Sequence, residues 1–412
     1  MPPSPDPATS TPRNVYAFGL TSFLNDTASE MAYWVLPAFV ASLGAGPAQL
    51  GIIEGVAESV ASLAKLFSGY LADRLPRRKP LVVGGYVVAN AVKPLLAIVS
   101  SWWQILGIRF ADRFAKGIRG TARDVMVAES VDTARIGSAY GLIQAMDSAG
   151  AIVGPLAALA LIGYFGMRGV FAAAAVPGAL AILVAWFGIR ETSRKNEFRG
   201  SATATVAEEQ HHDAPVRPAS TERGRVSDSP SRLPGAFYYV LIVVTLFSLG
   251  NSSDMFLVLR AENVGIPTSH APLLGLVFNI TYTLLSWPAG KISDRISRSR
   301  LAAAGYLVFA IVYLVFALGP SRQAIWGAMA FYGLFYAFTN PVLKALVVET
   351  VPADVRGRAL GIYFFLTSAT TLLASVITGW LWKAYGAPAP FYLSAAIAAV
   401  SAILLLFRRR MR

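Results

Sequence analysis

Apolar runs about 20 residues long recur along nearly all of this 412-residue chain. A helix needs roughly 20 apolar residues to cross a bilayer. Charged residues make up only 14% of the chain, against about 25% in a soluble domain. Two soluble domains of this composition would leave much apolar surface unburied. We therefore predict an all-α membrane protein.

The spacing of these runs predicts twelve transmembrane helices in two six-helix halves, residues 14–190 and 236–407. Residues 1–13 are predicted to be a disordered tail, 191–235 a flexible linker, and 408–412 a basic C-terminal tail. The predicted spans are 14–43, 48–72, 80–100, 103–124, 138–162 and 169–190 in the first half, and 236–259, 271–293, 301–319, 323–347, 359–382 and 389–407 in the second.

Two sequence echoes indicate that the halves are related by duplication. An apolar run ends in Asp73-Arg74 and turns into a basic corner, and the same pattern recurs at Asp294-Arg295. A second pair of segments, which begin at Glu129 and Glu349, aligns without gaps at nearly the same offset. Two matches at one offset are stronger evidence than either alone.

The positive charge of the chain indicates its orientation in the membrane. The net charge is +13, and Lys and Arg gather in the loops at one end of the predicted helices, seventeen against four. By the positive-inside rule, both termini and the linker lie in the cytoplasm, in the inner or plasma membrane of the cell. This bias explains the charge without nucleic acid as a partner.

The two halves and the corner motif resemble those of the major facilitator superfamily. The carrying motif is Gly69-x-x-x-Asp73-Arg74-x-x-Arg77-Arg78-Lys79 between the second and third spans, with Pro76 where the family usually has Gly. The resemblance covers residues 14–407 apart from the linker. It implies a secondary transporter that works by alternating access, with the lipid bilayer, a small-molecule substrate and protons as partners, and a monomer as the expected state.

The resemblance also implies a cytoplasmic gate. Asp73 and Arg74 would pair with Glu129 and Arg135, and Asp294 and Arg295 with Glu349 and Arg356, so that each latch holds the halves together. The alternative is that these charges only set the topology.

Ionisable residues inside the spans concentrate in the first half and face a cavity or other helices, because charge facing lipid is costly. The span-four segment Arg113-x-x-Lys116-Gly117 resembles a family motif linked to proton coupling. Structural ion pairs between helices are the alternative for part of this set. The candidates for the substrate cavity are Lys65, Lys93, Arg109, Asp112, Arg113, Lys116, Asp147, Asn251, Asp254 and Asn279.

The proton-coupling candidates are two carboxylate pairs, each one helical turn apart. Glu30 follows Asp26, and Glu58 follows Glu54. A carboxylate with a like charge this close is more readily protonated. We expect Glu30 and Glu58 to respond to protons, with Asp26 and Glu54 as modulators.

Three functions remain open from the sequence. Gly150-x-x-x-Gly154-Pro155 resembles a signature of proton antiporters, which favours proton-coupled export of a small molecule. The alternative is a proton symporter that imports an organic anion through a cluster of Lys65, Lys93, Arg109 and Arg113. A membrane-embedded enzyme or receptor is least favoured, because no nucleotide-binding loop, metal cluster or cysteine is present, and no cofactor or metal is expected.

Overall fold

The computed structural model describes residues 12–45, 47–192, 232–267, 270–319 and 321–407, and within these ranges the chain is helical with no strand. The predicted N-terminal tail up to residue 11, linker residues 193–231 and the basic tail 408–412 lie outside the described residues.

The helices follow the predicted spans closely. In the first half they are α1 (Arg13–Ser42), α2 (Pro47–Arg74), α3 (Lys79–Val92) with the 3₁₀ turn η1 (Lys93–Ala97), α4 (Trp102–Glu129), α5 (Ile136–Ala173) and α6 (Ala175–Gly188). In the second half they are α8 (Gly235–Gly250), α9 (Met255–Asn263), α10 (Ala271–Arg295), α11 (Arg298–Leu318), α12 (Arg322–Glu349), α13 (Arg356–Tyr385) and α14 (Ala389–Phe407).

The number of crossings agrees with the predicted twelve. Eight described segments are long and apolar enough to cross a membrane. One of them, Thr133–Gly188, is 56 residues long and makes two crossings, because α5 consists of two helices joined by a kink at Gly166. The φ of 62° at Gly166 lies in the left-handed region that favours glycine. The other three crossings are α1, α2 and α4, which carry most of the charged residues inside the first half.

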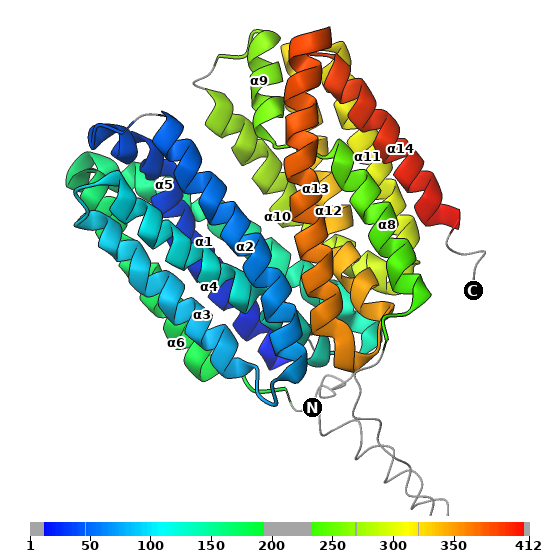
Figure 1. The fold of residues 1–412 in the computed structure, drawn as a ribbon, viewed down its shortest axis with the longest axis horizontal. Coiled ribbons are helices and arrows are strands. Elements are labelled where there is room, and N and C mark those ends of the chain that lie inside the picture. Colours follow the sequence, from blue (N-terminus) through cyan, green and yellow to red (C-terminus); the bar gives the residue numbers. More distant parts are fainter. Residues whose placement is uncertain (1–11, 46, 193–231, 268–269, 320, 408–412) are drawn as a thin grey trace, which may run out of the picture.

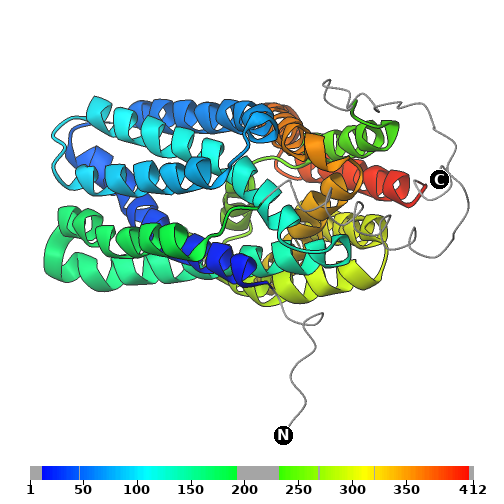
Figure 2. The same ribbon diagram turned by 90° about the horizontal axis from the view of Figure 1, so that it is seen from below.

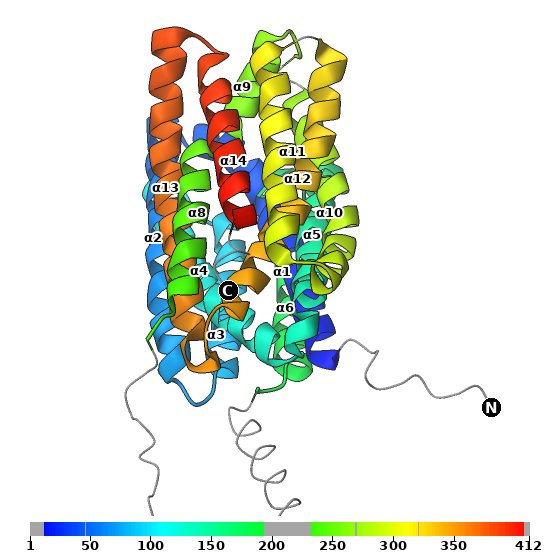
Figure 3. The same ribbon diagram turned by 90° about the vertical axis from the view of Figure 1, so that its right-hand side faces the viewer.

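The two halves form separate bundles that meet at one end (Figure 1). Helices α1 to α6 form one bundle and α8 to α14 the other, and their ribbons approach at the bottom of Figure 1 and separate toward the top. The view in Figure 3 shows that α1 begins and α2 ends at the bottom of the molecule. We call this the closed end. Figure 2 shows the same two bundles from below.

Glycines allow two very close helix crossings at the closed end. A Cβ atom at Gly69 of α2 would run into the backbone of Gly357 and Gly361 of α13. A Cβ atom at Gly290 of α10 would likewise meet the backbone of Gly137 of α5. The crossings α2–α13 and α5–α10 each join one half to the other, and the duplicated motif supplies the glycine of both.

The aspartates of the same motif cap helices of the opposite half. Asp73 accepts hydrogen bonds from the backbone N–H groups of Gly357 and Arg358, both at 2.7 Å. Asp294 accepts from the backbone N–H groups of Gly137 and Ser138, both at 2.8 Å. Each carboxylate therefore lies at a helix N-terminus, where unpaired N–H groups and the helix dipole favour an anion.

The structure gives the glutamate of each latch an arginine partner that was not predicted. Glu129 forms an ion pair with Arg78 at 2.6 Å, and Glu349 pairs with Arg298 at 3.1 Å. The arginine residues that follow the two aspartates, Arg74 and Arg295, are exposed. Sequence spacing could not foresee this, because the basic corner folds back under the end of α4 or α12.

The remaining predicted gate residues lie at helix starts. Arg135 immediately precedes α5 and Arg356 is the first residue of α13, so both stand beside the capped N-termini. The described start of the linker is also attached here. Glu191 accepts hydrogen bonds from the backbone N–H groups of Arg78 and Lys79 at 2.9 and 3.0 Å.

The seventh predicted span, 236–259, is broken rather than continuous. Residues 251–254 between α8 and α9 are non-helical. This segment, Asn-Ser-Ser-Asp, consists of short polar side chains that compete for backbone hydrogen bonds. The Oγ of Ser375 on α13 accepts the backbone N–H of Ser253 at 3.0 Å, which stabilises the break.

We expect Asp73→Asn to loosen the closed end, because it removes the charge from two hydrogen bonds that join the halves. Hydrogen bonds to a charged group contribute about 1.5–3 kcal/mol each. Access to a cysteine at Thr121, which lines the space between the halves, should rise roughly tenfold for a membrane-impermeant thiol reagent applied at the closed end. The chain has no native cysteine.

Asp132→Asn is the matched control, because Asp132 is exposed in a nearby turn and its side chain caps no helix. Equal labelling rates in Asp73→Asn, Asp132→Asn and the parent would show that the aspartate cap does not hold the closed end.

Candidate functional site: a charged central cavity between the halves

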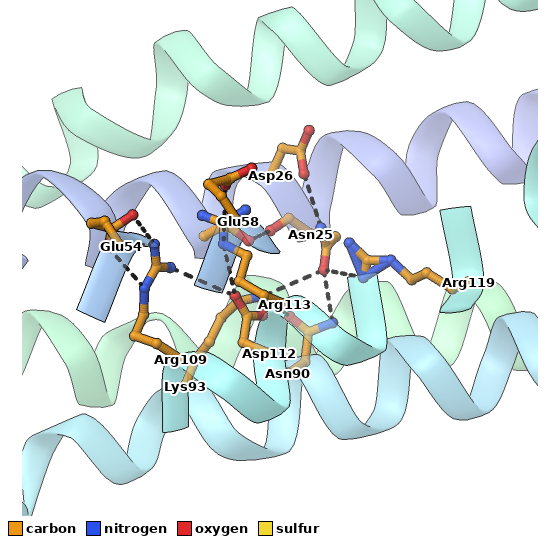
Figure 4. Close-up of polar contacts among 11 residues, drawn as sticks. Asn25, Asp26, Glu54, Glu58, Asn90, Lys93, Arg109, Asp112, Arg113 and Arg119 are labelled. Atoms are coloured by element: carbon orange, nitrogen blue, oxygen red, sulfur yellow. Dashed lines mark hydrogen bonds and ion pairs between the residues drawn. The ribbon is translucent and has the colours of Figure 1, made fainter. Parts of the chain in front are cut away.

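A cluster of charged residues fills the interior of the N-terminal half (Figure 4). Asp112 of α4 lies at its centre, with Lys93 and Arg109 each at 3.7 Å and Arg113 at 3.9 Å. Its side chain is only 8% exposed. One buried carboxylate is therefore shared by three cations. Arg109, Asp112, Arg113 and Lys116 form one charged stripe along α4, because they recur at helical spacing.

Two glutamates of α2 complete this cluster from the adjacent helix. Glu54 receives two hydrogen bonds from Nη2 of Arg109, at 2.8 and 2.9 Å, and one from its Nε at 3.2 Å. Glu58 lies 4.0 Å from Arg113, and its side chain is 66% exposed. Of the two predicted proton-responsive residues, Glu58 thus faces open space beside a cation.

Asn25 of α1 links this cluster to α3 and α4. Its Oδ1 accepts hydrogen bonds from Asn90 at 3.1 Å, Arg119 at 3.3 Å and Lys93 at 3.4 Å, and its Nδ2 donates to Asp26 at 2.9 Å. Sequence reasoning missed both asparagines. Their position within apolar runs was the available signal, because an uncharged amide inside a membrane helix needs partners too.

A central cavity of about 470 Å³ lies between the two halves. This volume is within the range of small-molecule sites. Of the predicted cavity residues, four line it: Lys65, Lys116, Asp147 and Asn279. Asp26, predicted as a modulator of proton coupling, also lines it.

The other predicted cavity residues lie elsewhere. Lys93, Arg109 and Asp112 border a much smaller pocket inside the first half, because α4 turns this side of its charged stripe toward α1 and α3. Asp254 lies at the break between α8 and α9, where its Oδ1 accepts a hydrogen bond from Tyr332 at 2.7 Å, and Asn251 ends α8 at the same break.

An ion-pair cluster at the cavity joins the halves. Arg123 of α4 lies 3.1 Å from Asp124 and 3.7 Å from Asp147, and donates a hydrogen bond to Ser22 at 2.8 Å. Lys344 of α12 lies 3.5 Å from Asp124. This last ion pair crosses from one half to the other, and sequence spacing gave no signal for it.

Three further cations at the cavity have no carboxylate partner in the part of the chain that the structure describes. Within the described ranges, Lys65, Lys116 and Arg119 form no ion pair within 4.0 Å. Arg119 stacks over Tyr86, with its guanidinium 4.3 Å from the ring centre, and Lys65 lies 5.5 Å from the ring centre of Phe364 on α13. Five cations and three carboxylates line the cavity, which leaves an excess of positive charge.

The glycines of the antiporter-like motif pack α5 against α1. A Cβ atom at Gly150 would meet the backbone of Phe23 and Thr27, and one at Gly154 would meet Thr27 and the Cβ of Glu30. Pro155 borders a second, apolar pocket. Among the described residues, Glu30 has no cation within 4.0 Å, unlike Glu54 and Glu58.

Groups of three or more His, Asp or Glu side chains that could hold a metal ion are absent from the part of the chain that the structure describes.

We expect Asp112→Asn to destabilise the N-terminal half, because Lys93, Arg109 and Arg113 would lose the carboxylate they share. Removing one member of a buried ion cluster costs about 3–5 kcal/mol. The melting temperature of the protein in nanodiscs should therefore fall clearly. Glu58→Gln is the control, because its exposed side chain makes a single long ion pair. Similar melting temperatures for the two variants would contradict this structural role.

Comparison with known proteins identifies the family. The Major Facilitator Superfamily model matches residues 18–259 and 239–412. An MFS-type transporter of Methanocaldococcus jannaschii is 31% identical over 407 residues, covering 96% of this chain and 94% of that protein. Multidrug resistance protein MdtG of Dickeya zeae is 25% identical over 403 residues, covering 95% and 93%.

Solved structures show the same fold. The human organic anion transporter MFSD10 superposes with a TM-score of 0.75 at 16% identity, covering 95% of this chain and 99% of that one. The fucose:proton symporter FucP of E. coli gives 0.73 at 14% identity, covering 96% and 98%. The chain belongs to the major facilitator superfamily, a family of membrane transporters and not of enzymes.

Proposed function

We propose that this transporter moves a small organic anion through the central cavity, with protons as the driving force and export as the direction. The observation that carries the proposal is the set of three cations, Lys65, Lys116 and Arg119, that line the cavity without a carboxylate partner among the described residues. Unpaired charge in a membrane-embedded site is costly, and a bound anion would compensate it.

Alternating access supplies the transport step in this proposal. The halves are held at the closed end by the crossings α2–α13 and α5–α10, and at the cavity by the ion pair between Asp124 and Lys344. Opening the closed end requires these contacts to separate, while the rigid halves rock about the site between them. An anion between Lys344 and the cations of α4 would compete with Asp124 for Lys344.

The orientation is part of the proposal. The excess of Lys and Arg in the loops of the closed end favours a cytoplasmic location for that end, together with both termini. The conformation described here would then open away from the cytoplasm, in the plasma membrane, with a single chain as the functional unit.

We expect Lys116→Gln to lower the affinity for anions by roughly tenfold or more. One charge-assisted hydrogen bond contributes about 1.5–3 kcal/mol, and 1.4 kcal/mol is tenfold in affinity. Thermal stabilisation of the purified protein by carboxylates, sulfonates, phosphates, sugars and amines would measure this. Lys383→Gln, an exposed lysine at the end of α13, is the control. Stabilisation by amines or sugars alone would contradict an anionic substrate.

Proton coupling is expected to depend on Glu30. Glu30→Gln keeps the size of the side chain and resembles its protonated form, so the variant should exchange substrate across liposomes but should not accumulate it against a gradient. The measurement is uptake driven by a pH difference alone, with Glu58→Gln tested in parallel. If both variants still concentrate substrate, protons are carried elsewhere.

The same assay tests the direction of transport, through the direction of the pH gradient that drives accumulation of substrate. Export is supported by the antiporter-like motif and by the relatives named as multidrug resistance proteins. Accumulation when protons and anion move in the same direction would instead support the symporter.

A further inference from the structure

A second pocket adjoins the charged cavity. It has a volume of about 320 Å³ and is lined by α1, α5 and α10. It shares two residues, Ala151 and Asn279, with the central cavity. The two pockets are therefore neighbours along the interface between the halves.

The chemistry of this second pocket is opposite to that of the cavity. Asn279 is its only amide, and the lining includes no charged residue. Several apolar side chains in it are well exposed, among them Leu159 at 73% and Leu156 at 53%. Trp34 of α1 and Leu273 of α10 add large apolar surface from the facing helices.

The course of α5 places the apolar pocket on the open side of the cavity. Ala151 is shared, Asp147 borders the cavity on the side of the closed end, and Ile162 borders the apolar pocket near the other end of the helix. Ile162 lies eleven positions after Ala151. At 1.5 Å per residue this is about 16 Å, the scale of a medium-length alkyl chain.

We infer that the substrate is an amphipathic organic anion, with its charged group among Lys65, Lys116 and Arg119 and its apolar part in the pocket between α1, α5 and α10. The inference rests on the proposed function and specifies its substrate class. The continuity of the two pockets at Ala151 and Asn279 allows one molecule to occupy both. A purely polar anion would occupy only the charged cavity.

Binding of n-alkyl sulfonates to the full-length protein in nanodiscs tests this. Sulfonates stay anionic at all working pH values, so chain length is the only variable from methanesulfonate to octanesulfonate. We expect affinity, measured by thermal stabilisation, to rise by roughly fourfold for each methylene, the gain from burial of one CH₂ group. Lys116→Gln should lower the affinity for every sulfonate of the series by about the same factor, whatever the length of its alkyl chain.

Gly275→Phe tests the location of the alkyl chain. Gly275 lines the apolar pocket, and a Cβ atom there would meet no atom within 4 Å, so the new ring can fill the pocket without a backbone clash. We expect the dependence on chain length to be largely lost while methanesulfonate binding is retained. Gly327→Phe on α12 is the matched control, because its Cβ would also meet nothing and it lies outside both pockets.

The outcomes separate the two proposals. If Gly275→Phe does not fold, Leu159→Asn reduces the apolar surface at an exposed side chain and should flatten the same dependence. If affinity does not rise with chain length, or rises equally in both glycine variants, the inference is overturned. If no sulfonate binds at all and Lys116→Gln changes nothing, the proposed anion transport fails as well.

Discussion

The contact on which this architecture depends is a carboxylate at a helix N-terminus of the opposite half. Asp73 caps α13 and Asp294 caps α5. Each cap is possible only because glycines let the two helices cross with their backbones in contact. The glycine and the aspartate of the motif thus act together, since the close approach brings the carboxylate within reach of the N–H groups. Such a contact can break reversibly, because water can hydrate both the carboxylate and the N–H groups when the halves move apart.

The two halves share a fold but differ in what fills them. The first half contains a charged network centred on Asp112, which is shared among Lys93, Arg109 and Arg113. The second half is filled largely by stacked aromatic rings, for example Phe247 on Tyr306 at 3.8 Å and Phe309 on Tyr313 at 3.9 Å. Lys344 is an exception, because it pairs with Asp124 of the other half. Most of the charge that a substrate would meet therefore belongs to the first half.

The charged residues of α4 divide into two functional groups according to the direction in which the helix presents them. Arg109 and Asp112 face α1, α2 and α3, where they hold helices together. Lys116 and Arg119 face the cavity and are left without carboxylates in the described structure. The first group explains how charge is tolerated inside the membrane, and the second group provides the positive surface on which the proposed function rests.

The sequence by itself determined the number of helices, the two halves and the duplicated motif, because apolar length and internal repetition are local properties of the chain. Helical periodicity also showed that Arg109, Asp112, Arg113 and Lys116 share one broad stripe. It could not show which part of the stripe faces a neighbouring helix and which faces the cavity, because helix rotation is set by packing. Only the tertiary structure showed that Asp73 binds the backbone N–H groups at the start of α13. Charged groups interact according to their distance in space, and Asp73 and Gly357 are in contact although they lie 284 positions apart in the sequence.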